Sequence, residues 1–274
     1  MTEPSRESRA SARQVSDSWE CGSPYEQYVG RWSRRIAPAF LAWLHLPHGR
    51  RWLDVGCGTG ALCAAIADAC SPASLAGVEP SEGFLMSARA NLGQRAALHA
   101  GSASAIPLED ASVDVVVSGL VLNFVPDVGA ALAEMSRVAA DGATIAAYVW
   151  DYAGRMELMR HFWNAALELD PGAARFDEGL RFPLCSLGAL AAAFREAGLG
   201  GIETTAIDIP TQFADFQDYW SPFLGGQGPA PAYAMSLDEG ERERLRERVR
   251  DRLPIRTDGS IELIARALSV RALR

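Results

Sequence analysis

The sequence of 274 residues contains no lysine, because its 26 basic residues are all arginines. Without a lysine amine the chain cannot form a Schiff base, and it lacks the lysine that a P-loop needs. Cysteine is scarce as well. The five cysteines are odd in number and never stand in a C-x-x-C pair. We therefore expect neither a disulfide framework nor a metal site.

Long apolar runs and excess positive charge are also missing. No run is long enough to span a bilayer, and the polar residues 1–22, which we expect to be a disordered tail, lack the apolar core of a signal peptide. The net charge of −8 disfavours an extended surface for nucleic acid or an anionic membrane. These absences predict a cytoplasmic protein with a small-molecule substrate, and they leave the oligomeric state open.

Three alternate glycines mark the stretch RWLDVGCGTG at residues 51–60. A short apolar strand precedes Gly56, Gly58 and Gly60, and the helix-forming run ALCAAIADA follows them. Glycine accepts positive φ and lets a ligand approach the backbone closely. The free N–H groups of a helix start also favour a polar or anionic ligand. We therefore expect this turn to hold a nucleotide-like cofactor.

An acidic residue at the end of the next expected strand supports this interpretation. Residues 74–78 are expected to form that strand, and Glu79 follows Gly60 by 19 residues. A carboxylate at this spacing accepts hydrogen bonds from ribose hydroxyls in nucleotide-binding folds.

Strands and helices alternate through the first part of the chain. Further strands are expected at residues 96–100, 113–122 and 143–150, with a helix that Pro126 opens and Gly142 stops. Five strands alternating with helices predict an α/β fold with a doubly wound, mostly parallel sheet, whose ligand lies outside the carboxyl ends of the strands.

Segments on either side of this core are expected to cover the ligand. Residues 25–46 predict a helix that Pro38 kinks or divides. Residues 151–186 look like an insertion, and residues 210–254 combine aromatic side chains with a Gly/Pro-rich stretch, which suits a lid or a docked surface helix. An amphipathic helix is expected within the latter, followed by a closing strand. We expect residues 23–274 to form one domain.

The motifs LDVGCGTG, VEPS, GSA and LNFVPD occur in an order that resembles class I S-adenosylmethionine-dependent methyltransferases, in particular the small-molecule branch. The resemblance covers roughly residues 25–150. It implies a seven-stranded Rossmann-like sheet that ends in a hairpin, and in-line transfer of a methyl group from S-adenosylmethionine. The turn also satisfies the relaxed pattern G-x-G-x-x-A, so an NAD(P)-dependent oxidoreductase stays an alternative, as does a non-catalytic cofactor-binding protein.

The resemblance also implies roles for individual residues. The methionine part of the cofactor would lie against the glycine turn, the ribose against Glu79 and the adenine near Pro80 and Ser102, where the family often has an acid. Tyr28 and Arg31 are further candidates from the N-terminal helix. The full set of expected cofactor residues is Tyr28, Arg31, Asp54, Gly56, Cys57, Gly58, Gly60, Glu79, Pro80, Ser102, Ala103, Leu120 and Asn123.

Candidates for acid–base catalysis lie beyond the expected fifth strand: Asp151, Tyr152 and His161. Aromatic residues of the insertion and lid favour an apolar or aromatic acceptor of metabolite size. These residues are Phe162, Trp163, Phe176, Phe182, Tyr219, Trp220, Phe223 and Tyr233.

Overall fold

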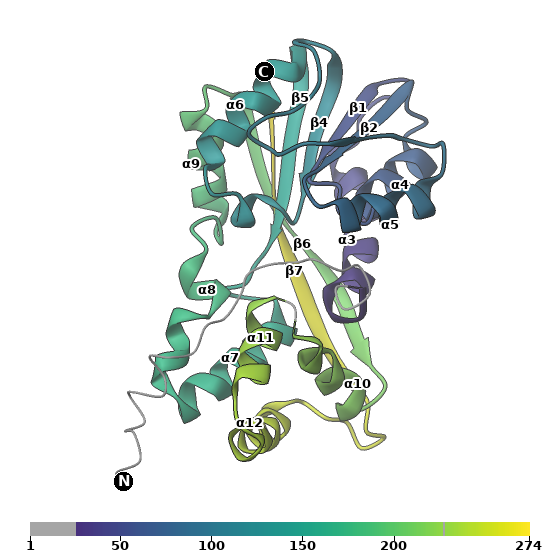
Figure 1. Cartoon of the computed structure of the whole chain (residues 1–274). Coiled ribbons are helices and arrows are strands. Elements are labelled where there is room, and N and C mark those ends of the chain that lie inside the picture. Colours follow the sequence, from purple (N-terminus) through teal and green to yellow (C-terminus); the bar gives the residue numbers. More distant parts are fainter. Residues whose placement is uncertain (1–25, 227) are drawn as a thin grey trace.

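A computed structural model of the chain describes residues 26–226 and 228–274 (Figure 1). A single seven-stranded sheet, in the order β3-β2-β1-β4-β5-β7-β6, forms its centre. The first five strands pair in parallel, and β7 runs antiparallel to both β5 and β6. This arrangement confirms the expected α/β fold and its closing hairpin. The strands are β1 (Arg51–Val55), β2 (Ser74–Glu79), β3 (Ala97–Ala100), β4 (Val113–Gly119), β5 (Ala139–Trp150), β6 (Gly200–Phe213) and β7 (Ile261–Leu273).

Helices pack around the upper part of the sheet and form a separate cluster below it (Figure 1). The helices around the sheet are η1 (Glu26–Gly30), α3 (Arg31–Leu44), α4 (Ala61–Ala69), α5 (Glu82–Leu92), η2 (Leu122–Phe124), α6 (Val128–Val138) and α9 (Leu187–Glu196). The lower cluster, which we call the helical lobe, consists of α7 (Glu157–Leu169), η3 (Pro171–Arg175), α8 (Glu178–Arg181), α10 (Phe216–Trp220), η4 (Ser221–Gly225), α11 (Pro229–Ser236) and α12 (Glu239–Arg252). The expected tail lies outside the described residues.

Alternating side chains of the strands feed two separate hydrophobic cores. Tyr148 and Trp150 of β5 belong to the core that includes residues of α3, α4 and the helical lobe. Ala147 and Val149 belong to the opposite core, under α6 and α9. Successive side chains of a strand point to opposite faces, so the even-numbered residues at the end of β5 face the cofactor side and the lobe.

The long antiparallel pair β6 and β7, whose connection contains α10 to α12, joins the sheet to the helical lobe. β6 and β7 continue below the other strands, paired as far as Phe213 and Ile261, and the lobe packs around their lower ends (Figure 1). In the lobe, the rings of Phe162 and Phe223 stack with centroids 4.5 Å apart and an interplanar angle of 8°. The aromatic stretch packs into the lobe, where Phe216 and Trp220 are buried.

The boundaries of β5 and α6 differ from the expectation. Strand β5 begins at Ala139, before Gly142, and the pairing with β4 jumps from Val113–Ala139 to Val115–Thr144. Gly142 adopts φ +74° within this irregular stretch. The glycine therefore serves a bulge in the strand and does not stop the helix, which ends at Val138.

Other boundaries shift for local reasons. Helix α6 starts two residues after Pro126, because the Asp127 side chain caps it by accepting from the Ala130 N–H at 2.9 Å. Strand β4 ends at Gly119, because Leu120 has φ +65° and leaves the extended backbone conformation although the sequence stays apolar. Helix α3 is one helix that runs through Pro38.

Candidate functional site

A cavity of about 370 Å³ lies at the carboxyl ends of β1, β2, β4 and β5. Asp54 and the glycine turn line it from β1, Glu79 from β2, Gly119 from β4 and Trp150 from β5. Because parallel strands bring their carboxyl ends to one edge, residues about one hundred positions apart meet here. The cavity is therefore at the edge where the sequence places the ligand.

The three glycines of the turn all have positive φ but differ in the space beside their Cα atoms. A Cβ on Gly56, at φ +76°, would lie 2.6 Å from Val121 Cγ2, and one on Gly60 would lie 2.8 Å from Leu92 Cδ1. A Cβ on Gly58 would meet no heavy atom of the described residues within 4 Å. Packing thus requires Gly56 and Gly60, whereas Gly58 leaves open space beside its backbone in the cavity wall.

Glu79 ties the glycine turn to the end of β2. One of its carboxylate oxygens accepts from the Gly58 N–H at 3.0 Å, and the other accepts from the Ser81 N–H at 3.0 Å. The side chain is 7% exposed, and its burial raises the pKa of the carboxyl. A carboxylate oxygen carries two lone pairs. Glu79 is therefore held in place by the backbone and still has acceptor capacity for two hydroxyls.

Asp54 is the other carboxylate of the cavity wall. It is almost fully buried and accepts from the Cys63 thiol, whose Sγ lies 3.3 Å from Asp54 Oδ2. Burial raises the pKa of Asp54 to about 7, and the charge of Glu79 contributes in the same direction. The group is thus poised to ionise when a cation binds nearby.

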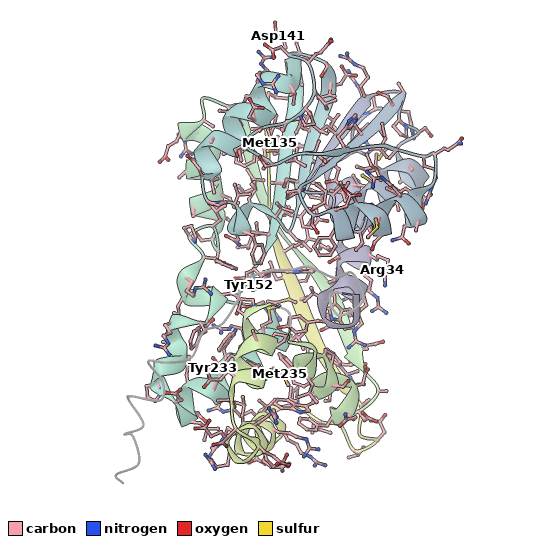
Figure 2. All side chains as sticks on the ribbon, in the orientation of Figure 1. Arg34, Met135, Asp141, Tyr152, Tyr233 and Met235 are labelled. Carbon is pink, nitrogen blue, oxygen red and sulfur yellow. The ribbon has the colours of Figure 1, made fainter. Side chains whose placement is uncertain are left out.

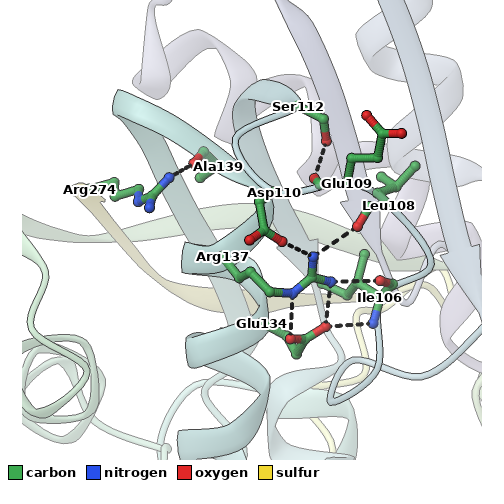
Figure 3. Close-up of polar contacts among 9 residues, drawn as sticks. All are labelled: Ile106, Leu108, Glu109, Asp110, Ser112, Glu134, Arg137, Ala139 and Arg274. Carbon is green, nitrogen blue, oxygen red and sulfur yellow. Dashed lines mark hydrogen bonds and ion pairs between the residues drawn. The ribbon is translucent and has the colours of Figure 1, made fainter.

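Hydrogen bonds and ion pairs of Arg137 hold the loop between β3 and β4 (Figure 3). The same loop supplies Ser102 and Ala103 to the cavity. Arg137 of α6 donates to both oxygens of Glu134, to Asp110 and to two loop carbonyls, Ile106 O at 2.8 Å and Leu108 O at 2.9 Å. Bidentate pairing with a carboxylate restricts the guanidinium geometrically. We infer that these contacts of Arg137 fix the position of the part of the cavity wall that Ser102 and Ala103 form.

Aromatic side chains line the end of the cavity nearest β5. They are Phe124, Tyr148, Trp150 and Tyr152. A Cβ on Gly119 would lie 2.6 Å from the Tyr148 hydroxyl oxygen, so this glycine makes room for the Tyr148 side chain. Val29 of η1 and Ser33 of α3 also line the cavity. This end of the cavity is mainly apolar.

The cavity gathers ten of the residues expected from the sequence. They are Asp54, Gly56, Cys57, Gly58, Glu79, Pro80, Ser102, Ala103, Leu120 and Tyr152. Ser102 lies beside a second hydroxyl, with Ser104 Oγ 3.3 Å from its own Oγ.

Other expected cofactor residues lie behind the cavity wall. The ring of buried Tyr28 packs edge-on against Phe223 of the lobe, with centroids 5.3 Å apart. Arg31 pairs with Asp218 at 2.9 Å. Asn123 is buried and donates from Nδ2 to Cys185 Sγ at 3.7 Å. None of these three residues is among those that line the cavity.

Two of the three expected catalytic residues, Asp151 and His161, do not line the cavity. The Asp151 carboxylate accepts the Gly154 N–H at 2.8 Å and the Arg155 N–H at 2.9 Å, so it caps the turn after β5. His161 is a half-buried residue of α7 whose pKa is lowered by burial. Tyr152 alone of the three lines the cavity.

The aromatic residues that suggested an acceptor site belong to the lobe and its border. Phe162, Trp163 and Tyr233 pack together there, with ring centroids 5.1 to 6.3 Å apart. The aromatic lining of the cavity is instead Phe84, Phe124, Tyr148, Trp150 and Tyr152. Helical spacing indicated which rings are buried but not what they contact. A position at the end of a buried strand was the available signal for Trp150 and Tyr152.

Two kinds of feature are absent from the residues that the structure describes, 26–226 and 228–274. These residues contain no helix long and apolar enough to cross a membrane. They also contain no group of three or more His, Cys, Asp or Glu side chains that could hold a metal ion.

Known proteins are similar to the part of the chain that surrounds this cavity. Residues 53–147 match the family described as a methyltransferase domain. A demethylmenaquinone methyltransferase of Roseiflexus castenholzii is 37% identical over 101 residues, which are 36% of this chain and 42% of the relative. A malonyl-[acyl-carrier protein] O-methyltransferase of Geobacter sulfurreducens is 33% identical over 127 residues, 46% of this chain and 47% of the relative. The matches thus span less than half the length of either relative.

The fold is shared over a longer stretch. A candidate methyltransferase of an antibiotic biosynthesis pathway in Anabaena variabilis superimposes with a TM-score of 0.61, at 22% identity, over 86% of this chain and 96% of that one. The glycine turn, Glu79 and the whole of β2, β3 and β4 lie within the part that matches the family, whereas β6, β7 and the helical lobe lie outside it. Residues 53–147 are therefore similar to a methyltransferase domain, and the chain shares the fold of the Anabaena protein.

Proposed function

We propose that this chain transfers a methyl group from S-adenosylmethionine to a small apolar or aromatic metabolite. One observation carries the proposal. A glycine turn anchored by Glu79 and a set of aromatic side chains at the end of β5 share one cavity. A cofactor on the first would present its reactive end to an acceptor on the second.

The residues present fit this cofactor. The open side of Gly58 would admit it, Glu79 would accept from its ribose hydroxyls, and Asp54 would face its ammonium group. Pro80, Ser102 and Ala103 would border the adenine. When bound, the cofactor supplies a methyl group activated by a sulfonium. The chain's own residues then have to align the acceptor and exclude water.

The acceptor end supports an apolar or aromatic molecule. Arginine does not occur among the described residues that line the cavity, which disfavours a free carboxylate as the acceptor. Trp150 is 1% exposed, and its indole N–H has no hydrogen-bond partner within the described part of the chain. A buried donor of this kind favours a ligand with a polar atom on an apolar frame. The name of the Roseiflexus relative, a demethylmenaquinone methyltransferase, is consistent with this chemistry.

The roles of single residues form part of the proposal. Of the three catalytic candidates, we favour Tyr152, since it lines the cavity. We also propose that residues 23–274 work as one domain, with residues 151–186 and 210–254 closing the acceptor side.

Calorimetric titration with S-adenosylhomocysteine and with NAD⁺ and NADP⁺ tests the cofactor. Binding of S-adenosylhomocysteine without binding of either nicotinamide nucleotide would support the proposal, and the opposite pattern would refute it. Formation of S-adenosylhomocysteine from S-adenosylmethionine with a panel of phenols, amines and indoles then tests catalysis. A protein that binds the cofactor but turns over none of a broad panel would favour the non-catalytic alternative.

A further inference from the structure

Three aromatic rings contact one another at the acceptor end of the cavity. Phe124 and Tyr152 line the cavity. The ring of Phe182 lies edge-on to both, with its centroid 5.0 Å from that of Phe124 and 5.3 Å from that of Tyr152. Phe182 is half-buried and is not itself among the residues that line the cavity. A change of the Phe182 side chain therefore reaches the cavity through two rings of its wall.

Two buried carboxylates attach α8 to α7. Asp177 pairs with Arg160 of α7 at 2.6 Å and caps α8 by accepting the Gly179 N–H at 2.8 Å. Glu178 is 1% exposed and accepts from the indole N–H of Trp163, which also belongs to α7. Because it is costly to leave a buried polar or charged group without its partner, these contacts resist separation of the two helices.

The same helix is packed against the turn after β5. A Cβ on Gly179 would lie 2.5 Å from the carbonyl oxygen of Tyr152, so no side chain fits between α8 and this turn. Phe182 directly follows α8 and donates its N–H to the Glu178 carbonyl at 2.9 Å. Figure 2 shows Tyr152 at the junction of the sheet and the helical lobe. The backbone of Phe182 is thus held in a fixed position relative to Tyr152.

The three rings come from different parts of the chain. Phe124 lies within residues 53–147, the stretch that is similar to a methyltransferase domain. Tyr152 and Phe182 lie after that stretch, in the segment 151–186. Two of the three rings are therefore supplied from outside the part of the chain that matches the family.

The space for an acceptor is limited. The cavity of about 370 Å³ is near the lower end of the roughly 300–1,000 Å³ that ligand pockets occupy. Under the proposed function it has to receive the cofactor together with the reacting part of the acceptor. A compact acceptor suits this volume better than one with fused rings.

We propose that Phe182 sets the size of the methyl acceptor, by holding the rings of Phe124 and Tyr152 in place, and that the acceptor is a compact molecule with a single aromatic ring. The inference rests on the proposed function and narrows the class of its acceptor. Phe182 is a positioning residue, because it acts on the acceptor through two other rings.

Phe182→Ala tests the proposal through acceptor size. Truncation of a packed phenylalanine leaves space that its neighbours fill only in part, so Phe124 and Tyr152 gain room to move away from the acceptor. Phenol with 2-naphthol, and aniline with 6-aminoquinoline, are matched pairs of single-ring and fused-ring acceptors. We expect the unaltered protein to prefer the single-ring member, and kcat/KM in the variant to shift about tenfold toward the fused-ring member. The shift should appear in KM, since no reacting group is removed.

Further variants separate this role from a general loss of packing. Phe182→Tyr keeps the ring and should leave the ratio within about twofold of that of the unaltered protein. Phe182→Leu removes less volume and should shift the ratio about threefold, and this shift decides the test if Phe182→Ala does not fold. Phe176→Ala is the matched control, because Phe176 is also half-buried in the segment 151–186 and its ring packs against Tyr233, with centroids 5.7 Å apart. This control should lose stability without a change in the ratio.

A binding measurement requires no turnover. Ligand-observed NMR titration of the S-adenosylhomocysteine complex gives the dissociation constants of the same four compounds. In Phe182→Ala we expect the affinity for the fused-ring compounds to rise about tenfold relative to the single-ring compounds. In Phe176→Ala the relative affinities should stay as they are in the unaltered protein.

The outcomes separate this inference from the function on which it rests. A ratio that does not shift in Phe182→Ala or Phe182→Leu, or that shifts equally in Phe176→Ala, would overturn the role of Phe182. A preference of the unaltered protein for fused rings would overturn the assignment of a single-ring acceptor. In each of these cases S-adenosylhomocysteine still binds and the proposed methyl transfer stands. If S-adenosylhomocysteine does not bind, the proposed function itself fails.

Discussion

The sheet with its surrounding helices, which we call the sheet half, and the helical lobe are both rich in buried side chains. They differ in the hydrogen-bond partners of their buried polar groups. At the cavity, Glu79 and Asp54 are anchored by a few donors and keep acceptor capacity for a ligand. In the lobe, polar groups meet one another inside the core. The Tyr219 hydroxyl, for example, donates to the Leu158 carbonyl at 2.6 Å.

This difference shows that buried aromatic content alone does not make a binding site. The backbone has to leave space, as it does beside Gly58, and polar atoms have to retain unused capacity. The buried side chains of the lobe instead belong to the same hydrophobic core as those of α3 and α4, and Phe223 of the lobe contacts Tyr28. Mutations in the two regions should therefore separate stability from cofactor affinity.

Phe162→Ala should give the largest effect and should act on stability alone. The side chain is fully buried and stacks on Phe223, and such truncations cost about 3–5 kcal/mol of unfolding free energy. Denaturant unfolding measures this loss, and calorimetry on the folded variant should give an unchanged dissociation constant for S-adenosylhomocysteine. A tenfold loss of affinity would show that the lobe takes part in cofactor binding.

Gly56→Ala should damage the sheet half through its fold. The new Cβ would overlap Val121 at a backbone φ of +76°, which we expect to cost about 2–4 kcal/mol of stability and to weaken cofactor binding. Gly49 is the matched control, because it has φ +75° and a Cβ there meets no described heavy atom within 4 Å. Gly49→Ala should cost about 1 kcal/mol. Equal losses in both variants would mean that backbone strain, not the contact with Val121, sets the cost.

Glu79→Ala should reduce cofactor affinity more than stability. The variant removes the acceptor for the ribose hydroxyls and for the Gly58 and Ser81 N–H groups. We expect a loss of about 1–3 kcal/mol in the binding free energy of S-adenosylhomocysteine, measured by calorimetry. Glu82→Ala, a neighbouring exposed acid, should leave binding unchanged. An unaltered dissociation constant for Glu79→Ala would contradict the ribose assignment.

Asp54 should make cofactor binding depend on pH. Its pKa is raised from 3.8 to about 7, so only above pH 7 is it mainly ionised and able to attract the cofactor's ammonium group. We expect affinity to fall about tenfold for each pH unit below 7. Calorimetry between pH 5.5 and 8.5 measures this slope, and Asp54→Asn should flatten it. A pH-independent affinity of the unaltered protein would argue against a charged contact.

The same shift affects folding with a defined sign. The folded pKa of Asp54 exceeds the ordinary value of 3.8, so the folded protein binds the extra proton between pH 4 and 7. The stabilising contribution of the neutral carboxyl is therefore fully present below about pH 4 and is lost as the pH rises through 7. Asp54→Asn should accordingly become more stable than the unaltered protein at pH 8 in the absence of cofactor.

Local signals in the sequence predict the cofactor side of the sheet well. The glycines and Glu79 act within a few residues of their strand and helix ends, so spacing and residue type are enough. The closing strand and α12 were also predictable, because alternation and helical spacing persist over more than ten residues.

Long-range packing explains what the sequence did not reveal. In the sequence Glu178 resembles an ordinary surface acid in a loop rich in phenylalanine and glycine, and only the packing of α8 against α7 and the β5 turn buries it. Tyr148 could have belonged to either face of the sheet. The prediction that Gly142 ends the helix was wrong, because a strand bulge and a helix end both favour a glycine with positive φ.

A crystal structure of the protein with S-adenosylhomocysteine tests the central claim most directly. We predict that the ribose hydroxyls bind Glu79, that the amino-acid part lies along Gly56 and Gly58, and that the sulfur points toward the aromatic residues at the end of β5. Binding elsewhere, or in this cavity with the sulfur turned away from Tyr152, would contradict the division of work between the sheet half and the acceptor end.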